Sequence, residues 1–179
     1  MSTGRDVDEQ NRVLVAYGSK YGATAEIADA IGRALSAAGL TAEVQRAGSV
    51  RSLAPYRAVV LGSAVYAARW RADALRLLRR SELRERDVWL FSSGPVGEQK
   101  GDPEQFERFT RPKRVERIAA DIGAHEHVVF GGMVADDAGF VRKRMARSIP
   151  PELRDRRDWA EIETWAQSIA ANLTSTTRV

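Results

Sequence analysis

The chain has 179 residues, enough for one domain, and a chain of this length buries roughly 70% of its unfolded surface on folding. It contains no cysteine, which excludes disulfides, iron–sulfur clusters, thiolate zinc sites and cysteine nucleophiles. Lysine and arginine outnumber aspartate and glutamate by 28 to 24, and the net charge of +4 favours anionic partners without indicating nucleic acid. No apolar run reaches the roughly 18 residues that would span a membrane.

The first residues, 1–11, are polar and charged and lack the apolar stretch of a secretory signal. We therefore expect a disordered leader followed by one domain at 12–174. The sequence predicts a cytoplasmic protein, and peripheral contact with the inner face of the membrane is left open.

Short apolar runs alternate with longer helical patterns along the chain. Five runs predict strands, at 13–17, 41–46, 58–63, 88–91 and 128–130. Apolar residues recur three and four apart in the segments that predict helices, at 24–38, 71–80, 114–122 and 158–173. This alternation predicts an α/β fold, with an open, doubly wound parallel sheet and helices on both faces. The weakly patterned run at 41–46 is expected near an edge of that sheet.

The first predicted strand runs directly into 18–24, Gly-Ser-Lys-Tyr-Gly-Ala-Thr, and a helix follows at once. A glycine-containing turn at a helix start exposes backbone N–H groups, and the helix dipole adds partial positive charge. Ser19 and Thr24 offer hydroxyl donors at the same point. The segment lacks the Gly-Lys-Thr/Ser ending of a nucleotide triphosphatase loop and the glycine spacing of a dinucleotide site. It therefore predicts a cradle for a monophosphate.

The segment 19–24 resembles the phosphate loop of flavodoxins, Ser/Thr-x-Thr-Gly-Asn/Ser-Thr, which binds the phosphate of FMN. Ser19, Gly22 and Thr24 match that pattern. Tyr21 and Ala23 depart from it, and Ala23 lacks a side-chain hydrogen bond, so that weaker phosphate binding or a deazaflavin coenzyme in place of FMN stays open.

Two further segments, 61–66 and 91–97, follow predicted strands where flavodoxins place the loops beside the isoalloxazine ring. The resemblance implies a flavodoxin-like sandwich with a five-stranded sheet in the order 2-1-3-4-5. It also implies a set of cofactor-binding residues: Ser19, Lys20, Tyr21, Gly22, Ala23, Thr24, Ser63, Ala64, Val65, Tyr66, Ser93, Gly94, Pro95, Val96 and Gly97.

The later part of the chain has Phe-Gly-Gly-Met at 130–133, then a basic insertion, and then Arg-Asp-Trp at 157–159 at the start of the last predicted helix. This pattern resembles the menaquinone-dependent protoporphyrinogen oxidases, flavodoxin-like enzymes with an extra segment before the last helix. The resemblance covers 12–171 and implies an FMN-dependent oxidoreductase whose small-molecule partners are a porphyrinogen donor and a quinone acceptor. The alternatives are an electron-transfer flavodoxin, although such shuttles are typically acidic, and a flavodoxin-like protein that uses a deazaflavin coenzyme or has lost its cofactor.

Two long connections, near 95–112 and 135–157, follow predicted strands and are longer than most loops. We expect them to shape a substrate entrance. Within the second, 140–149 places apolar residues near one helical face and basic residues over much of the rest. This pattern suits a helix on an anionic membrane or over an acidic, apolar substrate, and the alternative is a solvated cover on the protein's own core.

Several aromatic and basic residues lie near these loops. Tyr66 is the stronger candidate for stacking on a planar ring, and Trp70 is the weaker one, with packing the expected role. Packing is also expected of the other three tryptophans, Trp89, Trp159 and Trp165. Arg69 and Arg71 are expected to be solvated, and neutralising a substrate carboxylate or the reduced flavin is the alternative.

His125 and His127 flank Glu126, a spacing that invites a metal interpretation. No third ligand lies nearby and a strand begins there, so we predict no metal site. No nucleophile–base pair is visible either, and no catalytic acid or base is assigned. In a flavin enzyme the ring carries the redox chemistry, while the protein supplies position and electrostatics.

Overall fold

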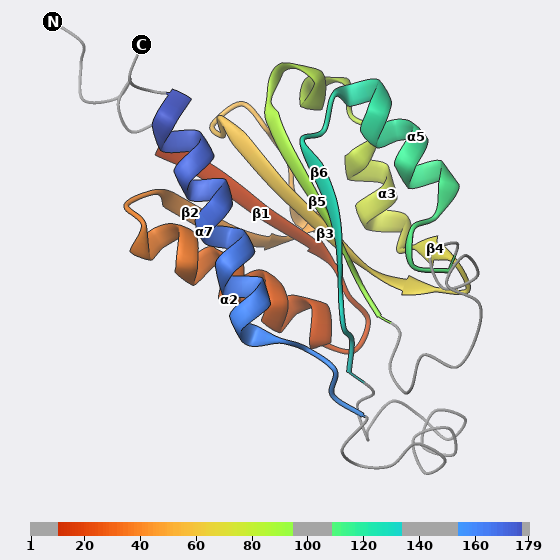
Figure 1. Cartoon of the computed structure of the whole chain (residues 1–179). Helices are drawn as coiled ribbons and strands as arrows, with labels where there is room; N and C mark the ends of the chain where they lie inside the picture. Colours follow the sequence, from red (N-terminus) through yellow and green to blue (C-terminus); the bar gives the residue numbers. More distant parts are fainter. Residues whose placement is uncertain (1–10, 95–108, 134–153, 177–179) are drawn as a thin grey trace, which may run out of the picture.

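A computed structural model describes residues 11–94, 109–133 and 154–176. The predicted leader, most of both insertions, Pro95 to Gly97 and the segment 140–149 lie outside the described residues. Figure 1 shows a central sheet with helices on both of its faces, which confirms the predicted α/β architecture.

Within the described residues the sheet has six strands: β1 (Arg12–Gly18), β2 (Thr41–Arg46), β3 (Ala58–Tyr66), β4 (Arg69–Trp70), β5 (Asp87–Ser93) and β6 (Glu126–Phe130). Five of them are parallel and lie in the order β2-β1-β3-β5-β6. Counted along the five parallel strands, this is the predicted order 2-1-3-4-5, with β2 at an edge as expected. The short β4 was not predicted, and it pairs antiparallel with the end of β3.

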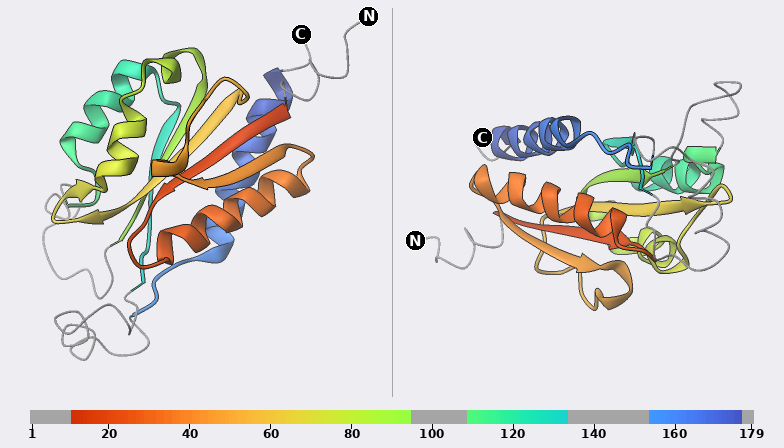
Figure 2. Two further views of the ribbon diagram at one scale, coloured as in Figure 1. Left: turned by 180° about the vertical axis from the view of Figure 1, so that it is seen from behind. Right: turned by 90° about the horizontal axis from the view of Figure 1, so that it is seen from below.

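Two pairs of helices sandwich the sheet. The helices are α2 (Ala23–Ala37), α3 (Ala72–Leu78), α5 (Lys113–Ile122) and α7 (Trp159–Thr176), with 3-10 turns η1 (Ala47–Ser49) and η2 (Ser81–Glu85). Figures 1 and 2 show α2 beside α7 on one face and α3 beside α5 on the other. The predicted helix at 71–80 is shorter than expected, because η2 follows α3 separately.

The alternation of side chains along β1 divides the core in two. Val13 and Val15 belong to the cluster under α2 and α7, whereas Leu14 and Ala16 belong to the cluster under α3 and α5. Successive side chains of a strand point to opposite faces, so a strand covered on both sides is apolar throughout. This burial on both faces explains why residues 13–17 form a continuous apolar run in the sequence.

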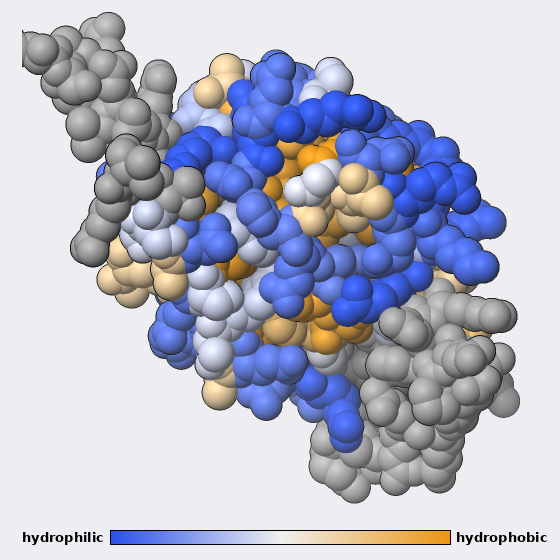
Figure 3. All heavy atoms as spheres, turned by 45° about the horizontal axis from the view of Figure 1, so that its top comes forward, coloured by the Kyte–Doolittle hydropathy of each residue, from blue (hydrophilic) through white to orange (hydrophobic). Residues whose placement is uncertain are grey.

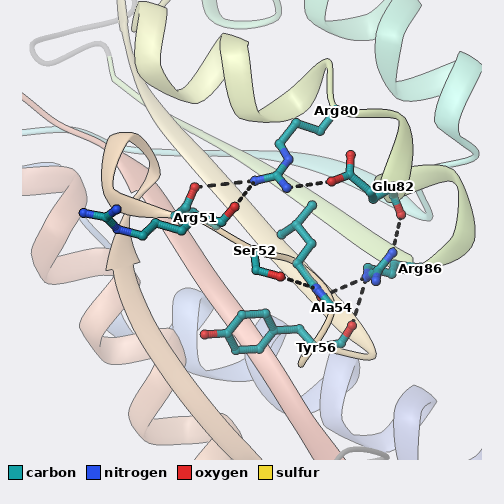
Figure 4. A network of polar contacts seen from close by, with 9 residues as sticks. Arg51, Ser52, Ala54, Tyr56, Arg80, Glu82 and Arg86 are labelled. Atoms are coloured by element: carbon teal, nitrogen blue, oxygen red, sulfur yellow. Dashed lines mark hydrogen bonds and ion pairs between the residues drawn. The ribbon is translucent and has the colours of Figure 1, made fainter.

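The connection between β2 and β3 contains only a 3-10 turn, and arginine side chains hold it in place (Figure 4). Arg86 Nε donates hydrogen bonds to the carbonyl oxygens of Leu53 and Tyr56, at 3.2 and 3.0 Å. Arg80 Nη1 donates to the carbonyl oxygen of Arg51 at 3.2 Å. Backbone groups outside regular structure need such partners, and here the arginines after α3 supply them.

Figure 3 shows a described surface that is mostly hydrophilic, with hydrophobic residues visible mainly between polar ones. Trp89 and Trp165 are 4% and 8% exposed, which confirms their packing role. The expectation for Trp159 was wrong, because this side chain is 42% exposed and lies under the Arg157 guanidinium, 4.6 Å from the ring centre. No helix among the described residues is long and apolar enough to cross a membrane.

Candidate functional site

The candidate site lies at the carboxyl edge of the sheet, where β1 and β3 end side by side. Gly18, the last residue of β1, is paired with Ser63 of β3. The chain leaves β1 for α2 on one face of the sheet and leaves β3 for α3 on the other. In open α/β sheets such a reversal opens a crevice in which ligands bind.

The loop after β1 is held by its own polar groups. Ser19 is 3% exposed, and its Oγ accepts a hydrogen bond from the backbone N–H of Gly22 at 3.0 Å. Arg46 Nη1, at the end of β2, donates to the Ser19 carbonyl oxygen at 3.2 Å. A serine hydroxyl that accepts one bond retains a proton to donate, so Ser19 can still serve a ligand.

The start of α2 suits an anion. Gly22 is the N-cap residue with φ of 93°, and no side chain caps the helix. The first N–H groups of a helix have no intrahelical acceptor, and they carry the positive end of the dipole. A Cβ added at Gly22 would meet no atom within 4 Å, so the space beside the loop is open. Ala23 and Thr24 are 9% and 1% exposed and follow directly in the first turn.

Two tyrosines connect the loops after β1 and β3. The rings of Tyr21 and Tyr66 meet edge to face, with centroids 6.3 Å apart. Lys20 Nζ lies 5.1 Å from the centre of the Tyr21 ring. The structure thus brings the predicted Tyr66 next to the predicted phosphate loop, on the rim of the crevice.

The end of β3 is fixed by the Ser63 hydroxyl. Ser63 is fully buried, and its Oγ donates to the Ala64 carbonyl oxygen and accepts from the Arg71 N–H, both at 2.9 Å. Its side chain therefore holds the backbone of the following hairpin, and the groups left for a ligand here belong to the main chain. Ala64 is buried and Val65 is partly exposed, as residues bordering a ligand site can be.

The ends of β5 and β6 approach each other closely. Ser93 is 5% exposed, and Gly94, with φ of 119°, donates its N–H to the Phe130 carbonyl oxygen at 3.1 Å. A Cβ added at Gly132 would lie 2.9 Å from the Gly94 Cα. Glycine is needed at 132 because the two backbones touch there, and it is favoured at 94 because of the positive φ. The remaining predicted loop residues, from Pro95 to Gly97, lie outside the described part of the chain.

A chain of hydrogen bonds, buried except at Glu116, anchors β4 to β5 and β6. Trp70 Nε1 donates to Ser92 Oγ at 2.9 Å, and Ser92 Oγ lies 2.9 Å from His127 Nε2. His127 Nδ1 contacts the Glu116 carboxylate. Because the carboxylate only accepts, Nδ1 carries the proton, and Nε2 accepts from the Ser92 hydroxyl. Burial is the largest influence on His127 and lowers its pKa below the ordinary value of 6.5, so the ring is neutral.

This chain of hydrogen bonds was not predicted from the sequence. Its members are separated by 22, 35 and 11 positions, and Ser92, which was expected after the predicted strand 88–91, lies inside β5. Ser92 is fully buried and its oxygen is occupied by Trp70, so the arrangement holds structure rather than presenting a nucleophile. Trp70 packs as expected, though from β4 rather than from a helix.

The histidines serve as structural partners in the described structure. His125 Nε2 lies 2.7 Å from Asp87 Oδ1, and its ring stacks on Trp89 with centroids 4.5 Å apart. No group of three potential metal ligands occurs within the described ranges.

Arg69, the first residue of β4, and Arg71, which follows β4, differ in their exposure to solvent. Arg69 is exposed, as expected. Arg71 is only partly exposed, and its Nε is buried without a hydrogen-bond partner among the described residues. Arg71 is therefore solvated only in part, because α3 begins directly after it and the residue packs against the end of β1.

The segments around 130–133 and 157–159, which carry the resemblance to protoporphyrinogen oxidases, lie side by side in the structure. Met133 and Asp155 form an antiparallel bridge, and the Arg156 N–H donates to the Gly132 carbonyl oxygen at 3.0 Å. A Cβ at Gly131 would lie 1.8 Å from the Arg156 carbonyl oxygen, so only glycine permits this approach. The described ends of the second insertion therefore meet at the carboxyl edge of the sheet.

Comparisons with known proteins agree with this geometry. The rubredoxin oxygen:oxidoreductase of Desulfovibrio gigas aligns with a TM-score of 0.63 at 16% identity, over 94% of this chain and 37% of that one. A flavodoxin from the domain Archaea aligns with a TM-score of 0.60 at 16% identity, over 91% of this chain and 99% of that one. A mutant flavodoxin from Pseudomonas aeruginosa gives 0.57 at 18% identity, with 91% and 99% covered.

At these identities the likeness concerns the fold, and the chain spans little more than a third of the Desulfovibrio protein. A search of curated protein sequences finds no match. The family model described as flavodoxin domain matches residues 14–158. Because that match covers most of the chain, the protein belongs to the flavodoxin domain family.

Proposed function

We propose that the chain binds FMN at the carboxyl edge of its sheet and acts as a flavin-dependent oxidoreductase. The observation that carries this proposal is the uncapped start of α2, with Gly22 in a left-handed conformation beside the open crevice between β1 and β3. Membership of the flavodoxin domain family supports the same ligand.

The residues present fit the phosphate end of FMN. Backbone N–H groups at Ala23 and Thr24 would hold the phosphate, and the Ser19 hydroxyl would donate to it. Ala23 contributes no side-chain hydrogen bond, so the main chain and the helix dipole would provide more of the affinity than in loops with a polar residue there.

The flavin ring would lie towards the ends of β3 and β5. Main-chain groups near Ala64 and Ser93 would border it, and Tyr66 would limit one side of the site. Once bound, FMN supplies the redox chemistry, because it accepts and releases electrons singly or in pairs. The protein's part is to orient the ring and to exclude water from the buried strand ends.

The proposed reaction is oxidation of an organic donor such as a porphyrinogen, with a quinone as the electron acceptor. The resemblance of 130–133 and 157–159 to protoporphyrinogen oxidases supports this choice, as does the meeting of these segments at the same edge of the sheet as the site. The net charge of +4 suits a substrate that carries carboxylates.

A second candidate is an electron carrier that docks with other redox proteins. It is favoured by the alignment with nearly the whole length of several flavodoxins. The positive net charge speaks against it, since such shuttles are typically acidic. A deazaflavin coenzyme in place of FMN is the third candidate, because Tyr21 and Ala23 depart from the usual loop.

The first test is titration of the purified chain with FMN, with riboflavin and with a deazaflavin coenzyme, followed by absorbance and fluorescence. Gly22→Ala and Gly39→Ala are matched variants, because both glycines have φ near 90° and neither Cβ would meet an atom within 4 Å. Both substitutions strain the backbone to a similar degree, but only Gly22 adjoins the proposed phosphate site.

We expect tight FMN binding by the wild type, a loss of about tenfold or more in Gly22→Ala, and wild-type affinity in Gly39→Ala. Failure of the wild type to bind FMN would overturn the proposal, and binding of the deazaflavin instead would establish the third candidate. Oxidation of protoporphyrinogen with menadione as acceptor would favour the enzyme. Rapid reduction of cytochrome c without activity on organic donors would favour the carrier.

A further inference from the structure

Arg71 lies beside the ends of β1 and β3, from which the chain continues to opposite faces of the sheet. It is the N-cap residue of α3, its N–H donates to Ser63 Oγ at 2.9 Å, and its carbonyl oxygen accepts from the Leu75 N–H at 2.9 Å. A Cβ added at Gly18 would be 3.0 Å from the Arg71 Cβ. Arg71 is thus fixed against the ends of β1 and β3. The contact on β1 is Gly18, the residue directly before the loop that starts at Ser19.

The backbone of Arg71 is held more firmly than that of an ordinary loop residue. The preceding residue, Trp70, is 5% exposed and is anchored through Ser92 to His127 and Glu116. Two residues in β4 and the hydroxyl of Ser63 therefore set where the arginine side chain begins. Such support is what a group needs in order to bind a ligand without a large entropic cost.

The side chain of Arg71 has unmet hydrogen-bonding capacity. Its Nε is buried and has no partner in the described part of the chain. The other arginine with such an Nε, Arg12, still reaches the Glu43 carboxylate through Nη2 at 3.2 Å. The nearest acid to Arg71 along α3 is Asp73, whose Oδ1 accepts from the Ala74 N–H at 3.0 Å and forms no ion pair with a described arginine. The other guanidinium nitrogens of this partly exposed residue can reach solvent, but a buried Nε–H without an acceptor is costly, and an anion would supply one.

We propose that Arg71 binds the phosphate of FMN, so that the phosphate lies between a fixed positive charge and the start of α2. This inference rests on the proposed function. It goes further because the first turn of α2 alone can hold a phosphate through neutral groups, whereas Arg71 adds charge from the opposite layer of the sandwich.

The added charge predicts selectivity. A phosphate monoester carries nearly two negative charges at neutral pH, a phosphodiester carries one, and riboflavin carries none. Arg71 would therefore favour FMN over both riboflavin and a coenzyme attached through a phosphodiester. The positive charge of Arg71 would thus compensate for the side-chain hydrogen bond that is missing at Ala23 in the loop.

The test compares Arg71→Met and Arg71→Lys with Arg69→Met, an exposed arginine at the other end of β4. Methionine retains much of the apolar stem and removes the charge. FMN and riboflavin are titrated against each protein by flavin fluorescence. We expect Arg71→Met to bind FMN about ten- to hundredfold more weakly, riboflavin affinity to be unchanged, and Arg69→Met to resemble the wild type. Arg71→Lys should recover part of the loss.

Stability without flavin supplies the second measurement. Removing an unsatisfied buried donor should leave the melting temperature of Arg71→Met equal to or above that of the wild type. A fall of several degrees would instead assign Arg71 a structural role and overturn the inference. Equal weakening of FMN and riboflavin, or unchanged FMN affinity, would also overturn it. If the wild type itself does not bind FMN, the proposed function is refuted. That result is distinguishable from the outcomes that overturn only the role of Arg71.

Discussion

The Arg157 guanidinium lies 2.6 Å from the Glu26 carboxylate, joining the segment before α7 to the first turn of α2. The same guanidinium is 2.6 Å from Asp155 and donates to Met133 Sδ at 3.1 Å. Its side chain is only 5% exposed. One arginine therefore connects the last helix, the end of β6 and the helix whose start forms the proposed phosphate site.

We predict that Arg157→Met lowers the free energy of unfolding by about 1–2 kcal/mol, because the hydrogen bonds to Glu26 and Asp155 are lost. The loss is limited because both carboxylates are about half exposed and regain water. Chemical denaturation followed by circular dichroism measures it. Arg33→Met, on the exposed side of α2, is the control, and equal stability of the two variants would contradict the prediction.

The turn between β3 and β4 stores backbone strain. Ala67 and Ala68 have φ of 48° and 56°, the left-handed region that costs an ordinary residue about 1–2 kcal/mol. The double variant Ala67→Asn with Ala68→Gly supplies the residues preferred in such two-residue hairpins. We expect it to raise the free energy of unfolding by about 1–2 kcal/mol in thermal and chemical denaturation. A decrease would show that the alanine side chains make contacts that outweigh the strain.

Tyr56 predicts a loss of stability at alkaline pH. Burial and the hydrogen bond to Glu43, at 2.6 Å, raise the pKa of Tyr56 from 10.0 to about 12. The folded state thus holds the phenol proton more tightly than the unfolded state, so this contribution is complete below pH 10 and is lost as the pH rises towards 12. Stability measured from pH 8 upwards should fall less steeply in Tyr56→Phe than in the wild type. Parallel curves for the two proteins would refute the assignment.

His127 predicts a loss of stability at acidic pH. Burial lowers its pKa below 6.5, so the unfolded state takes up a proton first as the pH falls. The contribution of the neutral ring is present above pH 6.5 and declines as the pH drops towards the lower folded value. Between pH 7 and pH 5, His127→Gln should lose less stability than the wild type. The histidine resonances, followed by nuclear magnetic resonance over the same range, should show His127 titrating below its ordinary pKa.

Ser92→Ala tests the hydrogen-bond chain in which Ser92 links Trp70 to His127. The substitution leaves the Trp70 N–H and the neutral His127 Nε2 without their partner, both in the core. We expect it to cost about 1–3 kcal/mol of unfolding free energy, whereas Ser36→Ala on the exposed side of α2 should be nearly neutral. A neutral Ser92→Ala would mean that this hydrogen-bond chain does not hold β4 in place.

Features that depend on neighbouring residues were predictable from the sequence. The apolar run of β1 specifies a strand covered on both faces, and Gly22 next to a helical pattern specifies an open helix start. The order of the five parallel strands followed from the family resemblance and is confirmed. The inferences about β1 and the start of α2 need only residues that are close together in the chain, whose conformational preferences are local.

Tertiary structure decided what depends on residues far apart in the chain. Trp159 has the periodicity of a packed helix residue, yet α7 begins at its own position and leaves it exposed beside Arg157. Trp70 comes close to His127 only because β4 pairs with the end of β3 and its Trp70 side chain contacts Ser92 of β5 and His127 of β6. Arg71 resembles any surface arginine in sequence, but packing against Gly18 removed part of it from water. Burial is a property of the assembled layers, so no local pattern could indicate which hydrogen-bond donor would be buried without a partner.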